Sequence, residues 1–335
     1  MTSRSDVPSL SVVIPVFNEP DWIGRSVGAL RAALENARWD AEIVVVDDGS
    51  TDDTPARLAE LPGVTVVTQP NGGRFAARLA GITKASGELV LMLDSRVVLE
   101  PGSLVFLRDQ LVEHPERTVW NGHINTDNTG NPYGAFMQGL VAVGWRRYVA
   151  NPRLTSFTAE DFDAFPKGTG LFLAPRELLE EAAGSFSSLY DDVRLASDDT
   201  RMLRWIAEQG PIFIAPGFAA EYNSRDSLPK FVKHAYFRGS TFVDGYLDSP
   251  GPVRNAAFAA GGVGVAGTIL LLRKPKAALA LAAAGSVAAG SVVRKSGGSK
   301  DQSLAVVKLL TLFAACFGAG VLRGLALAVR KRLGR

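Results

Sequence analysis

The amino-acid sequence predicts an α/β protein, with a mostly parallel sheet flanked by helices, followed by C-terminal helices that span or lie on a membrane. Two observations predict this. The first hundred residues alternate short apolar runs with segments of helical spacing, and the last 80 residues are apolar and basic with a single acid, Asp301. Strand–helix–strand repeats of this length form parallel sheets covered by helices.

Four apolar runs in the first hundred residues are the predicted strands. Each is rich in Val, Ile or Leu, lacks strict alternation and ends at Pro, Gly, Asn or Asp, as strands buried on both faces do. Ligands of such sheets bind at the carboxyl ends of the strands, so we expect the chemistry there. The four runs are 10–17, 42–47, 64–68 and 88–93.

The segments between these runs are the predicted helices. Ile23, Val27 and Leu30 recur at intervals of three and four and therefore share one helix face. Thr54 precedes Pro55, which is the pattern of an N-cap followed by proline in the first helical position. Further expected elements are helices at 74–85, 102–113, 175–183 and 198–208 and a short strand at 212–215.

Charge and cysteine content narrow the function classes. Lys and Arg total 36 against 34 Asp and Glu, so no nucleic-acid partner is expected. The single cysteine, Cys316, excludes an intrachain disulfide and favours a reducing compartment. His114 and His123 lie far from any Cys pair, so no zinc site is expected. Residues 1–9 are polar, which predicts no cleavable signal peptide and a cytoplasmic catalytic part.

The C-terminal region, 255–335, is the predicted membrane anchor. Its stretches 256–272 and 277–293 are each 17 residues without a charge, which as helices would extend about 26 Å, close to a membrane core. A third apolar stretch, 304–329, contains Lys308 and Arg323, and is expected to span or to lie in the interface. If all three stretches spanned the membrane, basic loops would lie on its outer side, which opposes the positive-inside rule. Buried helices of a soluble protein are the alternative.

The sequence predicts three parts in total. Residues 1–225 form the α/β domain, and 226–254 form an amphipathic interfacial segment before the anchor. In that segment, 228–247 mixes Leu and Phe with Lys, His and Arg, which is typical of a helix on an anionic membrane surface. An ordinary helix that closes the domain is the alternative.

Polar residues at the strand ends are the candidate ligand contacts. Asp47 and Asp48 follow a predicted strand, where a carboxylate can accept hydrogen bonds from a base or a ribose hydroxyl. The same Asp-Gly-Ser pattern also forms ordinary turns. Arg74 opens a helix after two glycines, where backbone N–H groups bind phosphate. A solvated surface arginine is an equal alternative.

Several segments together resemble glycosyltransferase family 2, the inverting family with the GT-A fold, over about 8–245. The resemblance lies in the strand ends at 12–19 and 45–54, in Asn-Gly-Gly-Arg at 71–74, in 87–94 and in Lys-Gly-Thr-Gly at 167–170. It implies a nucleotide-sugar site and an acceptor-side glycine loop. The implied nucleotide-sugar residues are Pro15, Phe17, Glu19, Asp47, Asp48, Arg74, Asp94 and Arg96, and the acceptor-side residues are Gly168, Thr169 and Gly170.

The resemblance also implies a catalytic base. Ser197-Asp198-Asp199 resembles the family's Glu-Asp motif, which makes Asp199 the candidate general base for the acceptor hydroxyl. Asp198 would raise the pKa of Asp199 or orient the acceptor. Taken alone, two acids in a first helical turn are more often partners of the helix dipole.

Asp94-Ser95-Arg96 departs from the family pattern, which has a metal-binding acid at the last position. The guanidinium of Arg96 could replace the metal on the diphosphate. Alternatively, Mg²⁺ or Mn²⁺ still binds through Asp94 and the phosphates. In the third interpretation the site is inactive. A divalent cofactor is therefore an open question in the sequence.

The expected function is transfer of a sugar, with inversion, from a nucleotide-diphosphate sugar to a lipid-linked or glycolipid acceptor at a membrane, in the synthesis of cell-envelope polysaccharide or glycolipid. The chain lacks the Gln-x-x-Arg-Trp motif of the family's processive synthases, so a polymerase is not expected. A catalytically inactive membrane scaffold is the main alternative, and a nucleotidyltransferase the weaker one.

Overall fold

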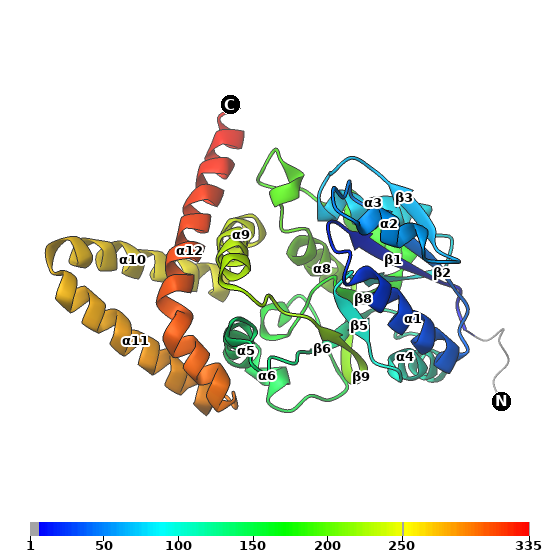
Figure 1. Ribbon diagram of the computed structural model, residues 1–335, viewed down its shortest axis with the longest axis horizontal. Coiled ribbons are helices and arrows are strands. Elements are labelled where there is room, and N and C mark those ends of the chain that lie inside the picture. The colour runs from blue at the N-terminus through cyan, green and yellow to red at the C-terminus, as the bar shows by residue number, and fades with distance from the viewer. Residues whose placement is uncertain (1–6, 250, 335) are drawn as a thin grey trace.

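The computed structural model describes residues 7–249 and 251–334, and places a sheet with its helices beside a group of C-terminal helices (Figure 1). The strands form one sheet in the order β3-β2-β1-β4-β8-β6-β9-β5, with β7 pairing β9. The predicted α/β class is confirmed. The strands are β1 (Leu10–Val16), β2 (Ala41–Asp47), β3 (Thr65–Thr68), β4 (Leu89–Leu93), β5 (Val97–Leu99), β6 (Trp120–Asn125), β7 (Thr155–Phe157), β8 (Leu171–Pro175) and β9 (Ile212–Tyr222).

The sheet is mixed rather than mostly parallel. The four strands predicted from the apolar runs, β1 to β4, are parallel to one another. Beyond them β8 is antiparallel to both β4 and β6, and β9 is antiparallel to β5 and β7. The predicted parallel arrangement therefore holds for β1 to β4, and among the other strands that the structure describes only β6 and β9 pair in parallel.

The helices predicted in the first 209 residues are all present, and α5 and α6 are additional ones. Asn131 caps α5, since its side chain accepts hydrogen bonds from the backbone N–H of Tyr133 and Gly134, and Pro132 occupies the first turn. The helices are α1 (Ile23–Ala37), α2 (Thr54–Ala59), α3 (Arg74–Lys84), α4 (Ser103–Glu113), α5 (Pro132–Gly144), α6 (Arg146–Val149), α7 (Arg176–Ser185), α8 (Asp198–Gln209), α9 (Leu228–Tyr246), α10 (Pro252–Arg273), α11 (Pro275–Lys295) and α12 (Lys300–Arg332).

β1, β4 and most of β2 are buried on both faces, as their apolar runs predict. β3 at the edge of the sheet is mostly exposed, so the prediction was wrong for that run. In β1, Val12 and Ile14 pack in the core on the side of α1 and α4, while Val13 packs on the side of α3, α7 and α8. Gly81 lets α3 approach closely, because a Cβ there would lie 2.2 Å from Val13 Cγ1. This packing fixes the beginning of α3 near the carboxyl ends of β1 and β2.

Three C-terminal helices, α10, α11 and α12, are long and apolar enough to cross a membrane. In Figure 1, α10 and α11 project away from the sheet, while α12 runs beside α9 and α5. Phe231 of α9 is buried between Phe136 of α5 and Phe313 of α12. Part of the apolar face of 228–247, which we expected to meet a membrane, is therefore covered by the protein's own helices.

Two glycines make the contact between α9 and α12. A Cβ at Gly239 would lie 2.1 Å from the carbonyl oxygen of Phe317, and one at Gly320 would lie 2.0 Å from that of Tyr236.

Replacing Gly320 by Val is expected to force the helices apart and lower the free energy of unfolding by about 1–3 kcal/mol. Thermal unfolding in detergent measures this. Gly318→Val is the matched control, because a Cβ there meets nothing within 4 Å, and equal effects of both variants would contradict the close contact.

Candidate active site

The predicted ligand contacts gather at the carboxyl ends of β1, β2 and β4, beside the first turns of α3 and α8. Asp48 accepts hydrogen bonds from the backbone N–H of Gly72 and of Gly73, both at 2.8 Å, and from Gln69 Nε2 at 2.7 Å. Asp48 thereby shapes the loop that opens α3. Asp47 accepts from the backbone N–H of Ser50 at 2.9 Å, which is the turn chemistry considered above.

The end of β1 presents an exposed ring. Pro15 is half-buried within β1, and Phe17 directly after the strand is 45% exposed. A planar ring exposed at a strand end offers a face against which a base can stack. Phe17 is thus available for the predicted role, while Glu19 is committed to other partners.

Arg96 is held by protein groups. Its Nη1 donates to Glu19 Oε2 at 3.2 Å, and its Nε and Nη2 both donate to the carbonyl oxygen of Asn223. The guanidinium also lies over the ring of Trp22, 5.4 Å from its centroid. To fork onto a diphosphate, Arg96 would have to leave these partners, which weighs against its acting in place of a metal.

Arg78 links two of the predicted acids, and sequence reasoning missed it. It is 2% exposed; its Nη2 lies 3.0 Å from Asp94 Oδ1 and its Nη1 lies 2.5 Å from Asp198 Oδ2. Burial disfavours the charge on Arg78, but the carboxylates outweigh it and raise its pKa. Burial likewise opposes ionisation of Asp198, yet Arg78 and Arg74 lower the pKa of Asp198. The signal in the sequence was a charged residue on the apolar face of α3.

Asp198 and Asp199 have different surroundings. Asp198 is buried and neutralised by Arg78, so it is not exposed to an acceptor. Asp199 is partly exposed, accepts a hydrogen bond from the backbone N–H of Thr200, and has no ion pair among the residues that the structure describes. Of the two, Asp199 is the carboxylate free to accept a proton.

The loop at 167–170 lies against Asp94. Asp94 N donates to the carbonyl oxygen of Gly170 at 2.9 Å, and Gly168 N donates to Asn121 Oδ1 at 3.1 Å. The hydroxyl of Thr169 is buried without a hydrogen-bond partner in the described part of the chain. Lys167 Nζ donates to two backbone carbonyl oxygens, and burial lowers the pKa of Lys167 to about 8. This loop and Asp94 therefore form one wall of the site.

Cationic side chains lie at the beginning of α3 and on α9. The guanidinium of Arg74 is about half exposed, lies over the ring of Phe237 at 5.3 Å, and comes no closer than 3.9 Å to Asp198 Oδ1. On α9, Arg238 Nε donates to His234 Nε2 at 3.0 Å. Burial, followed by the charges of Arg238, Arg225, Arg74 and Arg96, lowers the pKa of His234 to about 3. A neutral histidine among arginines leaves excess positive charge, which attracts an anionic ligand.

Asp94 is the residue available to a divalent ion. Among residues 7–249 and 251–334, no group of three His, Cys, Asp or Glu side chains could hold a metal. Asp94 binds Arg78 through one oxygen, and its side chain is 34% exposed. Such a donor set fits Mg²⁺ or Mn²⁺ if phosphate oxygens and water supply the remaining ligands.

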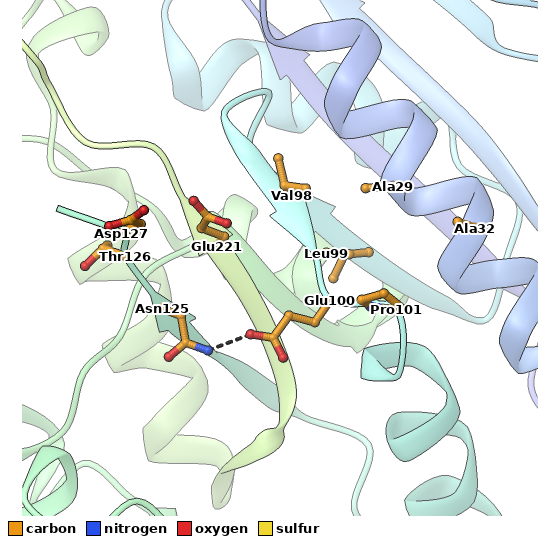
Figure 2. Close-up of a pocket in the computed structure, with 10 residues that line it drawn as sticks. All are labelled: Ala29, Ala32, Val98, Leu99, Glu100, Pro101, Asn125, Thr126, Asp127 and Glu221. Carbon is orange, nitrogen blue, oxygen red and sulfur yellow. Dashed lines mark hydrogen bonds between the residues drawn. The ribbon is translucent and has the colours of Figure 1, made fainter. Parts of the chain in front are cut away.

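A surface pocket beside α1 lies apart from this site. Figure 2 shows its lining, in which Asn125 Nδ2 donates to Glu100 Oε1 at 2.6 Å. The lining side chains come from α1, from around β5 and from the ends of β6 and β9. None of the predicted site residues lines the pocket, so we assign it no part in the chemistry.

Comparison with known proteins identifies the domain. The model of the family described as glycosyl transferase family 2 matches residues 11–159. An undecaprenyl-phosphate 4-deoxy-4-formamido-L-arabinose transferase of Sodalis glossinidius is 39% identical over 101 residues, which is 28% of this chain and 31% of the relative. Hyaluronan synthase of Pasteurella multocida is 31% identical over 166 residues, 48% of this chain and 16% of the relative. The chain thus matches less than a third of the length of these curated relatives.

Solved structures support the fold. A mannosyltransferase from Pyrobaculum calidifontis, in complex with GDP-Man and Mn²⁺, aligns with a TM-score of 0.57 at 19% identity, and the alignment covers 96% of this chain and 88% of that one. Residues 1–349 of TarS from S. aureus, in complex with UDP, align with a TM-score of 0.50 at 17% identity over 98% of this chain and 92% of that one. At these identities the likeness shows the fold alone. Residues 11–159 thus form a domain that matches glycosyl transferase family 2, and the chain has the GT-A fold.

Proposed function

We propose that the chain transfers a sugar, with inversion, from a nucleotide-diphosphate sugar to a lipid-linked acceptor, with Asp199 as the general base. The observation that carries this proposal is the contrast between the two neighbouring acids. Asp198 is locked in an ion pair with Arg78, while Asp199 beside it is partly exposed and unpaired among the described residues. A base needs such a free carboxylate within reach of the acceptor.

The reaction needs one bond to form and one to break. The acceptor hydroxyl loses its proton to Asp199 as its oxygen attacks the anomeric carbon of the donor sugar. The bond from that carbon to the diphosphate oxygen breaks on the opposite face, and the nucleoside diphosphate leaves with the electron pair. Arg74 lies at the N-terminus of α3, where it can stabilise the leaving negative charge.

The remaining site residues bind and orient the donor and the acceptor. Phe17 offers its exposed ring to the base, and Asp48 keeps the loop before α3 in shape. Gly168, Thr169 and Gly170 form the acceptor-side wall beside Asp94. Asp94, together with the diphosphate, would hold a divalent ion, which would supply positive charge to the leaving group.

A lipid-linked acceptor is supported by the C-terminal helices. Three helices long and apolar enough to span a membrane follow the domain, and α12 packs directly on it. The first relative described above is named for transfer to undecaprenyl phosphate, a lipid phosphate. We place the catalytic domain on the cytoplasmic side of the cell membrane, where nucleotide sugars are made.

The test is release of nucleoside diphosphate from a panel of UDP- and GDP-sugars by the full chain in detergent, with membrane lipid extract as acceptor. We expect release that requires the extract and falls about a hundredfold or more in EDTA, because metal-derived charge stabilises transition states by several kcal/mol. Adding Mn²⁺ or Mg²⁺ back should restore it.

Each other outcome has a distinct meaning. Release that survives EDTA would contradict a role for a metal and would leave Arg74 and Arg96 as the candidate cations. Release without the extract, at the same rate, would contradict a lipid-linked acceptor. If no donor releases nucleotide and Asp199→Ala equals the wild type, the chain is a scaffold and the proposed activity is wrong.

A further inference from the structure

The end of α9 lies directly against the beginning of α8, which carries the two acids. Asp244 of α9 is fully buried, and its Oδ2 accepts a hydrogen bond from the backbone N–H of Ser197 at 2.7 Å. Its Oδ1 accepts from the hydroxyl of Ser188 at 2.8 Å and from the backbone N–H of Leu189 at 2.6 Å. We propose that Asp244 is a positioning residue that fixes the first turn of α8 and thereby Asp199, an inference that rests on the proposed function.

The first turn of α8 depends on this contact because its own cap is weak. Ser197 stands at the N-cap, but its side chain makes no capping hydrogen bond. The backbone approach is also close, since a Cβ at Gly245 would lie 2.9 Å from Ser197 Oγ. Arg201, one turn into α8, donates through Nε to the carbonyl oxygen of Asp244 at 2.9 Å. Asp244 thus ties α9 to both the start and the second turn of α8.

The same contact reaches the C-terminal helices. The hydroxyl of Tyr190 donates to the carbonyl oxygen of Ser240 at 2.6 Å, and Ser240 Oγ donates to that of Gly320 in α12 at 3.1 Å. Lys331, near the end of α12, donates through Nζ to the carbonyl oxygens of Ser188 and Tyr190 at 2.8 and 3.2 Å. The segment 188–197 is therefore held by α9 and α12 together, and α12, which was predicted as part of the anchor, also supports the segment that leads into Asp198 and Asp199.

Asparagine is the informative replacement for Asp244. A carboxylate accepts on both oxygens, whereas an amide accepts on one and presents N–H groups on the other side. In Asp244→Asn, the backbone N–H of either Ser197 or Leu189 would therefore face a donor and lose its acceptor. Errors of about 1 Å in the placement of a catalytic group cost about a hundredfold in rate.

We expect Asp244→Asn to lower kcat for transfer at least about tenfold, while KM for the donor and the affinity for the nucleoside diphosphate change less than about threefold. Hydrogen exchange should accelerate in the peptide covering 195–203. Asp248→Asn is the matched control. Asp248 binds Arg201 at 3.0 Å just beyond the same end of α9, is exposed, and does not contact Ser197. This variant should match the wild type in both measurements.

Ser188→Ala provides a milder change, because it removes one hydrogen bond to Asp244 and leaves the one from Ser197. Its kcat and its rate of hydrogen exchange should lie between those of the wild type and those of Asp244→Asn. Wild-type kcat and wild-type exchange in Asp244→Asn would overturn the positioning role. So would a parallel loss of kcat, nucleotide affinity and unfolding temperature, which would indicate general destabilisation. Exchange is measured without turnover, so an inactive wild type would refute the proposed function while the exchange result still decides this inference.

Discussion

Replacing Asp199 by Asn is expected to lower kcat for sugar transfer about 10²- to 10⁴-fold, the range that a positioned general base contributes. The amide has nearly the shape of the carboxylate but cannot accept the acceptor's proton. Binding of the donor and of the nucleoside diphosphate should stay within about threefold of the wild type. Single-turnover transfer and nucleotide titration, both on the full chain in detergent, measure the two effects separately.

Glu208→Gln is the control for Asp199→Asn. It makes the same chemical change on the same helix, at an exposed position near the other end of α8. Its rate should equal that of the wild type. Should Asp199→Asn keep more than about a tenth of the wild-type rate, Asp199 would not be the base, and the unpaired carboxylate would need another explanation.

The half of the sheet formed by β1 to β4 could be predicted because its signals are local. A strand buried on both faces is apolar along most of its length, and β1, β2 and β4 show this in single runs. The later strands β6, β7 and β9 pair with segments far away in the chain. Of these strands, the sequence predicted only 212–215, which is part of β9, because the others carry polar residues that only the completed sheet explains.

The site was predicted as a set of positions but not as a set of contacts. The carboxyl ends of β2, β1 and β4 meet at one edge of the sheet, so Asp48 and Asp94 follow the strands on either side of β1, and Arg74 opens α3 beside the loop that Asp48 holds. Contacts such as that between Arg78 and Asp198 join residues 120 positions apart. No spacing rule reveals that pairing. The sequence also led us to consider Arg96 as a phosphate ligand, whereas its surroundings engage it with Glu19 and Asn223.

Helix α9, which we predicted as part of the interfacial segment, shows how composition can mislead. Aromatic and cationic residues on one helix are typical of a membrane surface, yet α9 directs Phe231 into the packing with α5 and α12 and Phe237 toward Arg74. Deleting the C-terminal helices would therefore remove a wall that supports α9 and, through Asp244, α8. Loss of activity on truncation would reflect this damage as well as the loss of membrane attachment. Single substitutions such as Gly320→Val leave the apolar helices in place, so they are the better test of how these helices support the domain.

Replacing Arg78 by Met is expected to destabilise the chain by about 3–5 kcal/mol, the cost of removing one member of a buried ion pair. Methionine fills much of the space of the arginine stem but leaves the buried carboxylate of Asp198 without its main partner. Arg78→Lys should recover only part of this loss, because one ammonium cannot reproduce the planar fork that binds Asp94 and Asp198 together. Thermal unfolding in detergent measures all three proteins.

Arg57→Met is the matched control, since Arg57 forms an ion pair with Glu60 in which both side chains are more than half exposed. Its effect should stay within about 0.5 kcal/mol.

The pH dependence of stability separates the contribution of the charge of Arg78 from that of its packing. The lowered pKa of Asp198 stabilises the wild type at neutral pH, and this stabilisation is lost as the pH falls below about 4, the ordinary range for an aspartate.

In Arg78→Met, by contrast, burial without the arginine should raise the pKa of Asp198, so the variant gains stability as the carboxylate is protonated. The difference between wild type and Arg78→Met should therefore be largest near neutral pH and shrink toward about pH 4. A difference that stays constant with pH would mean that Arg78 contributes by filling space. In that case the contrast between an ion-paired Asp198 and an Asp199 available as the base, on which the proposed function rests, would lose its physical basis.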